Sequence, residues 1–327
     1  MGRDPEQRPV IARHHLDTAD PTARGHALGT ADRDRIHAGI TGYRRLFEAV
    51  AVPPGLLRPY GEQAVEAIRG WAPDLYTELA ATARAAGAEP WQLGMLNART
   101  EILATVGATA EGECSTAVYL GADTPRTLQT WDWHEEFTDG KTLVSHPTAR
   151  IFTEAGILGK IGVNSAGLGL HFNILSHAED GDGIGVPVHV VARRILDEAA
   201  TLAEAVDLAR SARVSASTVL TVVSRDNDGA CVELSPAGTA VLPPDADGYL
   251  LHTNHFLDPR LAEGESAAEA GSTHVRYAHL VAHRELLTSP DPARWTALLD
   301  VHETERGRPS AAIRCRGCRS TSSGGPC

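Results

Sequence analysis

The stretch around Cys114 constrains this chain more than any other part of its sequence. Gly112 lies two residues before Cys114, and small hydroxyl residues followed by an apolar run come directly after it. This pattern predicts that Cys114 begins a β-strand. Asp132 lies 18 residues further on, at the end of a second predicted strand, residues 127–133. Two neighbouring antiparallel strands would bring the thiol and the carboxyl group together, so we expect a reactive site here.

The composition argues against several classes of partner. The 327 residues carry a formal charge of −12, which disfavours nonspecific binding to nucleic acid or to an anionic membrane. No apolar run approaches the roughly 18 residues of a membrane-spanning helix. The N-terminal residues have charge and proline where a secretory signal has an apolar core, so we expect a cytoplasmic protein. Only two of the 30 basic residues are lysine, Lys141 and Lys160, which we attribute to coding bias.

The predicted elements change character at Cys114. Apolar residues at helical spacing predict three helices before it, one from about Thr30, one over residues 62–86 and one from Pro90 to near Gly107. Residues 1–29 are polar and rich in Pro and Gly, with one strand expected around Ile11.

β-Rich runs alternate with helices after Cys114. The predicted strands cover residues 114–120, 127–133, 149–154, 157–164, 168–175, 218–223, 230–234 and 249–253. The predicted helices run from Pro187 to Val206, from Ser272 or Thr273 to Leu286, and over residues 291–301. Without a repeat or a low-complexity linker, this order indicates one α+β domain in which helical layers cover a β core.

Four motifs together resemble the isopenicillin-N acyltransferase family, that is, the acyl-coenzyme A:6-aminopenicillanate acyltransferases and their bacterial relatives. The motifs are Asn97-Ala98-Arg99-Thr100-Glu101, Cys114-Ser115-Thr116, Trp131-Asp132-Trp133 and His252-Thr253-Asn254-His255-Phe256. The resemblance rests on their order and spacing, and it extends from about Ala23 to about Ile313. This family belongs to the cysteine N-terminal nucleophile hydrolases.

The resemblance implies a four-layer αββα sandwich that is made as an inactive precursor and cut before the cysteine. The cut would fall between Glu113 and Cys114. It would separate a helical leader, residues 1–113, from a nucleophile-bearing chain, residues 114–327. The two cleaved chains would stay associated as one structural domain.

The resemblance also implies a set of catalytic residues. Cys114 corresponds to the nucleophile, Asp132 to the acid that orients the new ammonium or assists self-cleavage, and Asn254 to the oxyanion donor. An arginine near the C-terminus completes the set. We assign it to Arg314, which directly follows Ile313, with Arg316 as the alternative, since the family's motif is one residue out of step here. A Gly- and Ser-rich tail replaces the final strands of the family.

The chemistry of an N-terminal cysteine agrees with this assignment. A thiol has an ordinary pKa of about 8.5 and is little ionised at neutral pH. An α-amino group has a pKa of about 7.7–8.0, so it can act as the base for its own residue's thiol. We therefore expect a self-processing enzyme that cleaves a small-molecule amide or thioester and transfers the acyl group to an amine or water. No metal or organic cofactor is implied.

Other interpretations stay open from the sequence. A bile-salt or penicillin-V type amide hydrolase has its cysteine close to the initiator methionine, which disagrees with a 113-residue leader. Glu113 stands where the family usually has a small residue, so an unprocessed protein with a structural or binding role is a further alternative. His252 and His255, and the Cys315-x-x-Cys318 pair, lack the further ligands of a zinc site.

Overall fold

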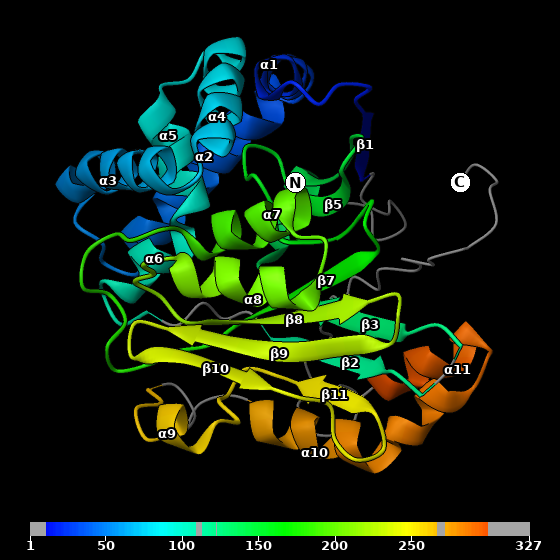
Figure 1. The fold of residues 1–327 in the computed structure, drawn as a ribbon. Helices are drawn as coiled ribbons and strands as arrows, with labels where there is room; N and C mark the ends of the chain where they lie inside the picture. The colour runs from blue at the N-terminus through cyan, green and yellow to red at the C-terminus, as the bar shows by residue number, and fades with distance from the viewer. Residues whose placement is uncertain (1–10, 109–112, 122, 267–271, 300–327) are drawn as a thin grey trace, which may run out of the picture.

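Two β-sheets lie face to face in the middle of the molecule (Figure 1). The structure is a computed structural model that describes residues 11–108, 113–121, 123–266 and 272–299. The large sheet has eight strands, in the spatial order β1 (Ala12–His15), β4 (Lys141–Ser145), β5 (Ala149–Glu154), β6 (Ile161–Asn164), β7 (Leu168–Ile174), β8 (Thr218–Ser224), β9 (Asp228–Ser235) and β10 (Gly238–Leu242). β1 is parallel to β4, and the other neighbouring pairs are antiparallel. The small antiparallel sheet has the order β11 (Tyr249–His252), β2 (Cys114–Tyr119) and β3 (Arg126–Trp131).

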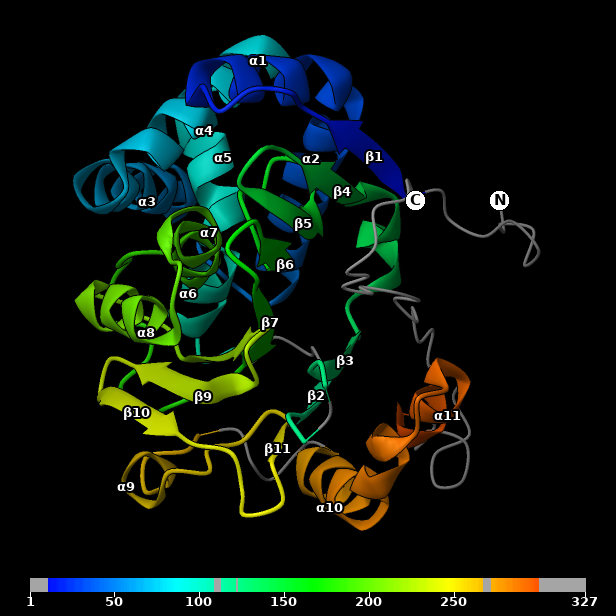
Figure 2. The ribbon, with the colours of Figure 1, turned by 45° about the vertical axis from the view of Figure 1, so that its right-hand side comes forward.

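Helices cover the outer faces of both sheets. α7 (Val188–Glu198) and α8 (Leu202–Ser211) pack on the large sheet, and α10 (Thr273–His283) packs on β2 and β11. Figure 2 shows α7 and α8 on one side of the paired sheets, with α10 and α11 (Pro292–Thr296) on the other. The predicted α+β fold with four αββα layers is confirmed.

The period-two alternation of β2 decides which of its side chains face the large sheet. Cys114 and Val118 belong to apolar clusters shared with that sheet, and Thr116 donates a hydrogen bond to Asn173 on β7 at 2.6 Å. Ala117 lies on the opposite face, in the cluster that includes Leu280 of α10. The reactive cysteine is therefore placed between the two sheets.

Residues 21–104 form a helical layer of their own. Its helices are α1 (Pro21–Ala31), α2 (Arg33–Ala49), α3 (Leu57–Trp71), α4 (Pro73–Ala86), α5 (Pro90–Asn97) and α6 (Arg99–Ala104), with a 3₁₀ turn η1 at Pro54–Leu56. α2 to α6 share one apolar core, which continues to Phe137 in η2 (Glu135–Gly140) and to Val190 of α7. The remaining short elements are α9 (Pro259–Ala262), η3 (Arg284–Thr288) and η4 (Ala297–Leu299).

The prediction of no helix before residue 30 is wrong. α1 lies so close to α4 that a Cβ added to Gly25 would come within 2.2 Å of the Glu78 carbonyl oxygen, and one added to Gly29 within 2.3 Å of the Thr82 carbonyl oxygen. The glycines that suggest a loop in the sequence thus permit close helix packing here. α1 also lacks an apolar stripe, so its helical form depends on this tertiary contact.

Three long predicted helices are each two helices. Pro73 separates α3 from α4, because proline disfavours helical geometry in the residue before it. Ala98 separates α5 from α6, and residues 199–201 separate α7 from α8, which begins with a capping box of Thr201 and Glu204.

The sequence did not predict β4 and β10, two five-residue strands whose periodic signal is weak and which form by pairing with neighbouring strands. Both strand predictions that frame the reactive site are confirmed to within two residues.

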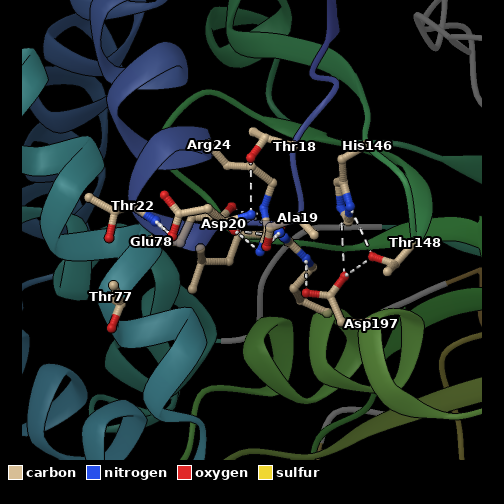
Figure 3. A network of polar contacts seen from close by, with 12 residues as sticks. Thr18, Ala19, Asp20, Thr22, Arg24, Thr77, Glu78, His146, Thr148 and Asp197 are labelled. Carbon is tan, nitrogen blue, oxygen red and sulfur yellow. Dashed lines mark hydrogen bonds and ion pairs between the residues drawn. The ribbon is translucent and has the colours of Figure 1, made fainter.

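A buried ion-pair cluster ties the helical layer to α7 (Figure 3). Glu78 on α4 accepts hydrogen bonds from Arg24 on α1 at 2.8 Å and from both terminal nitrogens of Arg193 on α7 at 2.9 and 2.8 Å. Arg193 also bonds Asp197 at 3.0 Å. Burial alone would raise the pKa of Glu78, but the guanidinium groups of Arg193 and Arg24 lower the pKa below its ordinary value of 4.5. The carboxylate therefore carries its charge in the folded protein.

Removing this carboxylate should destabilise the fold. Glu78→Ala leaves two buried guanidinium groups without their shared partner, and we expect the free energy of unfolding to fall by about 3–5 kcal/mol in chemical denaturation. Because the folded pKa is lowered, this stabilisation is present above pH 4.5 and is lost as the pH falls through the folded value. Glu66→Ala, which breaks an exposed pair with Arg69, should cost less than about 1 kcal/mol. Equal losses for the two variants would contradict this account.

Candidate active site at Cys114

Cys114 begins the central strand of the small sheet. Its partner across the β2–β3 pair is Trp131, so Asp132 follows directly after that pair and lies opposite Glu113. The Cys114 side chain is 1% exposed. The register of β2 and β3 therefore places Cys114 and Asp132 close together, as predicted.

The Glu113–Cys114 peptide bond is hydrogen-bonded at both ends. The backbone N–H of Asp132 donates to the Glu113 carbonyl oxygen at 3.1 Å. The backbone N–H of Cys114 donates to the side-chain oxygen of Asn254 at 2.8 Å. A donor on the carbonyl oxygen stabilises the negative charge that this oxygen would acquire if the carbon were attacked.

Asn254 follows β11 and is held in one orientation by its partners. Its Oδ1 accepts from Cys114 N and from Arg276 Nη2 at 2.9 Å, and its Nδ2 donates to the Ile174 carbonyl oxygen at 2.9 Å. Two donors on one side and an acceptor on the other fix which atom is oxygen. In this structure the side-chain donor of Asn254 thus bonds Ile174, while its acceptor faces Cys114. The oxyanion role stays a prediction.

Arg276 on α10 joins the site to the outer helical layer. It is 2% exposed, and it donates to the Cys114 carbonyl oxygen at 2.6 Å and to Ser115 Oγ at 3.0 Å. Its Nε donates to Ser272 Oγ, which in turn donates to the Glu113 carboxylate at 2.7 Å. Arg276 Nε lies 3.8 Å from the other carboxylate oxygen of Glu113. The charge of Glu113, unusual for the residue before the cysteine, is therefore compensated.

Asn173 on β7 connects the two sheets beneath the cysteine. Its Nδ2 lies 3.1 to 3.2 Å from three carbonyl oxygens, those of Cys114, His252 and Thr253. Its Oδ1 accepts from Thr116 Oγ1. One buried amide thus holds the starts of β2 and of the loop that carries Asn254.

Opposing charges act on the Cys114 thiol. Burial raises its pKa, while the cationic groups of Lys160 and Arg276 lower it and the carboxyl group of Asp132 raises it. The backbone N–H of Asp132 also stabilises the thiolate. Burial, with the charge of Arg99, lowers the pKa of Lys160 to about 7, although the Cys114 thiolate and Glu154 act in the opposite direction. Burial raises the pKa of Cys231 to about 12, and there the neighbouring charge is that of Glu233, which raises the pKa as well.

The structure brings together three of the four residues predicted for the site. Cys114, Asp132 and Asn254 meet at the end of the small sheet. Arg314 and its alternative Arg316 lie outside the described residues. Asn97 and Glu101 make structural hydrogen bonds, to Leu158 N and Val188 N respectively, and Arg99 pairs with Glu154 at 2.8 Å.

Sequence reasoning missed Arg276, Asn173 and Lys160. Two of them had a signal: Asn173 interrupts an apolar strand, and Arg276 follows the predicted helix cap, Ser272, by one helical turn. Lys160 had none, because its position beside Trp131 follows from the packing of the two sheets.

The described residues contain neither a group of three or more His, Cys, Asp and Glu side chains that could hold a metal ion nor a helix long and apolar enough to cross a membrane. His252 instead bonds Glu233 at 2.9 Å.

Fold and site together define an αββα protein with a buried cysteine at the first position of a central strand. Residues 120–305, more than half of the chain, match the family described as "Acyl-coenzyme A:6-aminopenicillanic acid acyl-transferase". The chain therefore belongs to this family, as the sequence motifs indicated. The match includes Asp132 and Asn254 and begins just after Cys114.

The chain is also similar to individual proteins. The acyl-coenzyme A:6-aminopenicillanic-acid-acyltransferase 40 kDa form of Emericella nidulans is 29% identical over 217 residues, which are 64% of this chain and 60% of that protein. The match thus spans less than two thirds of the relative. Penicillin V acylase from Agrobacterium tumefaciens has a TM-score of 0.43 and 19% identity, over 57% of this chain and 70% of that one. The Caenorhabditis elegans N-acylethanolamine-hydrolyzing acid amidase ortholog has a TM-score of 0.44 and 16% identity, over 58% and 86%.

Replacing Arg276 should destabilise the folded protein around Cys114. Arg276→Met removes the donor to Cys114, Ser115 and Asn254, and we expect the free energy of unfolding to fall by at least about 2 kcal/mol, because hydrogen bonds from charged groups contribute about 1.5–3 kcal/mol. Arg284→Met is the matched control. Arg284 pairs with half-exposed Asp245 at the surface, and its loss should cost below about 1 kcal/mol in the same denaturation experiment.

Proposed function

We propose that this chain is a self-processing cysteine N-terminal nucleophile enzyme that cleaves a small-molecule amide or thioester and transfers the acyl group to an amine or to water. The observation that carries the proposal is the geometry of the Glu113–Cys114 bond. Its carbonyl oxygen already has the Asp132 N–H as a donor, and the attacking thiol belongs to the next residue. Family membership supports the reaction class.

Self-cleavage would proceed by an N-to-S acyl shift at this bond. The Cys114 thiolate adds to the Glu113 carbonyl carbon, and the Asp132 N–H stabilises the charge on the carbonyl oxygen. The carbon–nitrogen bond then breaks, leaving a thioester on Cys114 that water hydrolyses. The Cys114 nitrogen, released as an amine, stays beside Asn254 Oδ1, which already accepts its hydrogen bond.

The mature site would use the same sulfur on an external substrate. The α-amine of Cys114 accepts the thiol proton, the thiolate attacks the substrate carbonyl carbon, and the acyl group passes to an amine or to water. Asp132, next to the cysteine in the strand pair, and Asn254, on its nitrogen, would orient that amine. We assign the catalytic roles to Cys114, Asp132 and Asn254.

The two fragments would remain one structural unit. Glu78 in the leader bonds Arg193 in the nucleophile-bearing chain, and the apolar core of the leader helices continues into Val190 of α7. Buried contacts of this kind do not depend on an intact backbone between Glu113 and Cys114.

Mass spectrometry of the denatured protein tests the proposal directly. Freshly made protein should separate into fragments of 113 and 214 residues, the second beginning with cysteine. Cys114→Ala should leave one intact chain, because no thiol is available, while Cys231→Ala should be cut like the wild type. A wild-type chain that stays intact yet hydrolyses amides at full rate would contradict self-activation.

A further inference from the structure

Self-cleavage needs a base that the uncleaved chain already contains. The α-amine that would activate the mature cysteine is, before the cut, the amide nitrogen of Cys114. An amide nitrogen is not basic, and this one donates its hydrogen to Asn254. The Cys114 thiol is buried, and burial raises its pKa. Some other group must therefore take the proton of the thiol. The identity of this group matters only if the chain cleaves itself as proposed above.

Lys160 is a buried amine beside two rings of the apolar cluster that contains Cys114. Its side chain is 1% exposed, and its Nζ lies 4.4 Å from the centroid of the Trp131 ring and 4.5 Å from that of the Phe172 ring. Trp131 is the residue paired with Cys114 across the two strands, and Phe172 precedes Asn173, which bonds the Cys114 carbonyl oxygen. Trp131, Phe172 and Cys114 belong to one buried cluster.

The Lys160 amine has no hydrogen-bond partner among the residues that the structure describes. Burying an ammonium without such partners is costly, so the neutral amine is favoured at this position.

The charged groups around Lys160 come from several elements. Arg99 of α6 and Lys141 of β4 disfavour the ammonium, whereas Glu154 of β5 and the Cys114 thiolate favour it. His189 of α7 stacks near the Phe172 ring, and its pKa is lowered by burial and by the charges of Arg99 and Lys160. Together these influences hold the pKa of Lys160 near 7, so a large share of the amine is neutral at physiological pH.

We infer that Lys160 accepts the proton of the Cys114 thiol in the uncleaved chain. The structure gives Nζ no hydrogen bond to Sγ, so the proton moves through one water molecule or after a rotation of the lysine side chain, giving a thiolate near an ammonium. The thiolate bonds to the Glu113 carbonyl carbon, and the carbon–nitrogen bond breaks as the ammonium returns the proton to the departing nitrogen. Water then adds to the thioester, which releases the Glu113 carboxyl group and the Cys114 thiol. Lys160 ends as it began, and the new α-amine replaces it as the base.

The test follows self-cleavage of chains made by cell-free synthesis, from pH 6 to 9.5. The wild-type rate should level off near pH 7–8, where Lys160 loses its proton, rather than above the ordinary thiol value of about 8.5. Lys160→Met should be about 10²–10⁴ times slower at pH 7, the usual contribution of a general base, and its rate should keep rising to the top of the range. A structural defect would slow cleavage without moving this profile.

Two further variants separate proton transfer from charge and from packing. Lys160→Arg keeps a cation that cannot accept a proton, so it should be slow as well, and cleavage at the wild-type rate would overturn the inference. Lys141→Met removes the other buried lysine beside Trp131, at 4.8 Å, and should still be cut with a rate that levels off, at slightly higher pH because the charge of Lys141 lowers the pKa of Lys160. Circular dichroism checks the fold of each variant.

The outcomes separate this inference from the proposed function. A wild-type chain that is never cut contradicts self-processing itself. A wild-type chain that is cut, with Lys160→Met cut at the same rate and with the same pH dependence, overturns the role of Lys160 alone. If Lys160→Met does not fold, the wild-type profile decides: a rate that levels off only above about pH 8.5 overturns the role of Lys160.

Discussion

The antiparallel register of β2 and β3 is the constraint on which the site depends. Pairing Cys114 with Trp131 places the Asp132 N–H on the Glu113 carbonyl oxygen, and a shift of one residue would turn every side chain of β2 to the other face. The central position of β2, between β11 and β3, secures this register from both sides. Asn173 and Arg276 then fix the strand from the large sheet and from the outer helix.

Much of this arrangement is readable from the sequence, for a physical reason. Strand alternation and turn residues are local, so the positions of Cys114 and Asp132 on adjacent strands followed from short-range pattern alone. The role of Asn254 as the oxyanion donor came from the family resemblance and stays a prediction, because in the structure its Oδ1 accepts from the Cys114 nitrogen and its Nδ2 donates to Ile174. Arg276 reaches the site from a helix more than 150 residues away in the chain. Its spacing from Ser272 places it on that helix, but its contact with Cys114 follows only from the tertiary fold.

The wrong sequence predictions in the helical layer also arise from contacts between residues far apart in the chain. Gly25 looks like a loop former in the sequence, yet it is needed because α4 leaves no room for a Cβ there. Lys141 and Lys160 are a further example of residues whose role depends on the tertiary fold. Composition suggested coding bias, but both side chains are buried beside Trp131, where a flexible amine behaves differently from the arginines that supply most positive charge elsewhere. Desolvation, which gives a buried lysine its distinct chemistry, is invisible until the fold is known.

The buried pairing of Glu78 with Arg193 has a consequence for how the protein can be renatured. These two residues lie on opposite sides of the Glu113–Cys114 bond. In the uncut chain their encounter is intramolecular, and its probability does not depend on protein concentration. In the cleaved form that we propose, the same encounter is a second-order event between two molecules. A precursor would then regain its structure on dilution, whereas the mature protein, once unfolded and dispersed, would recover more slowly as it is diluted further.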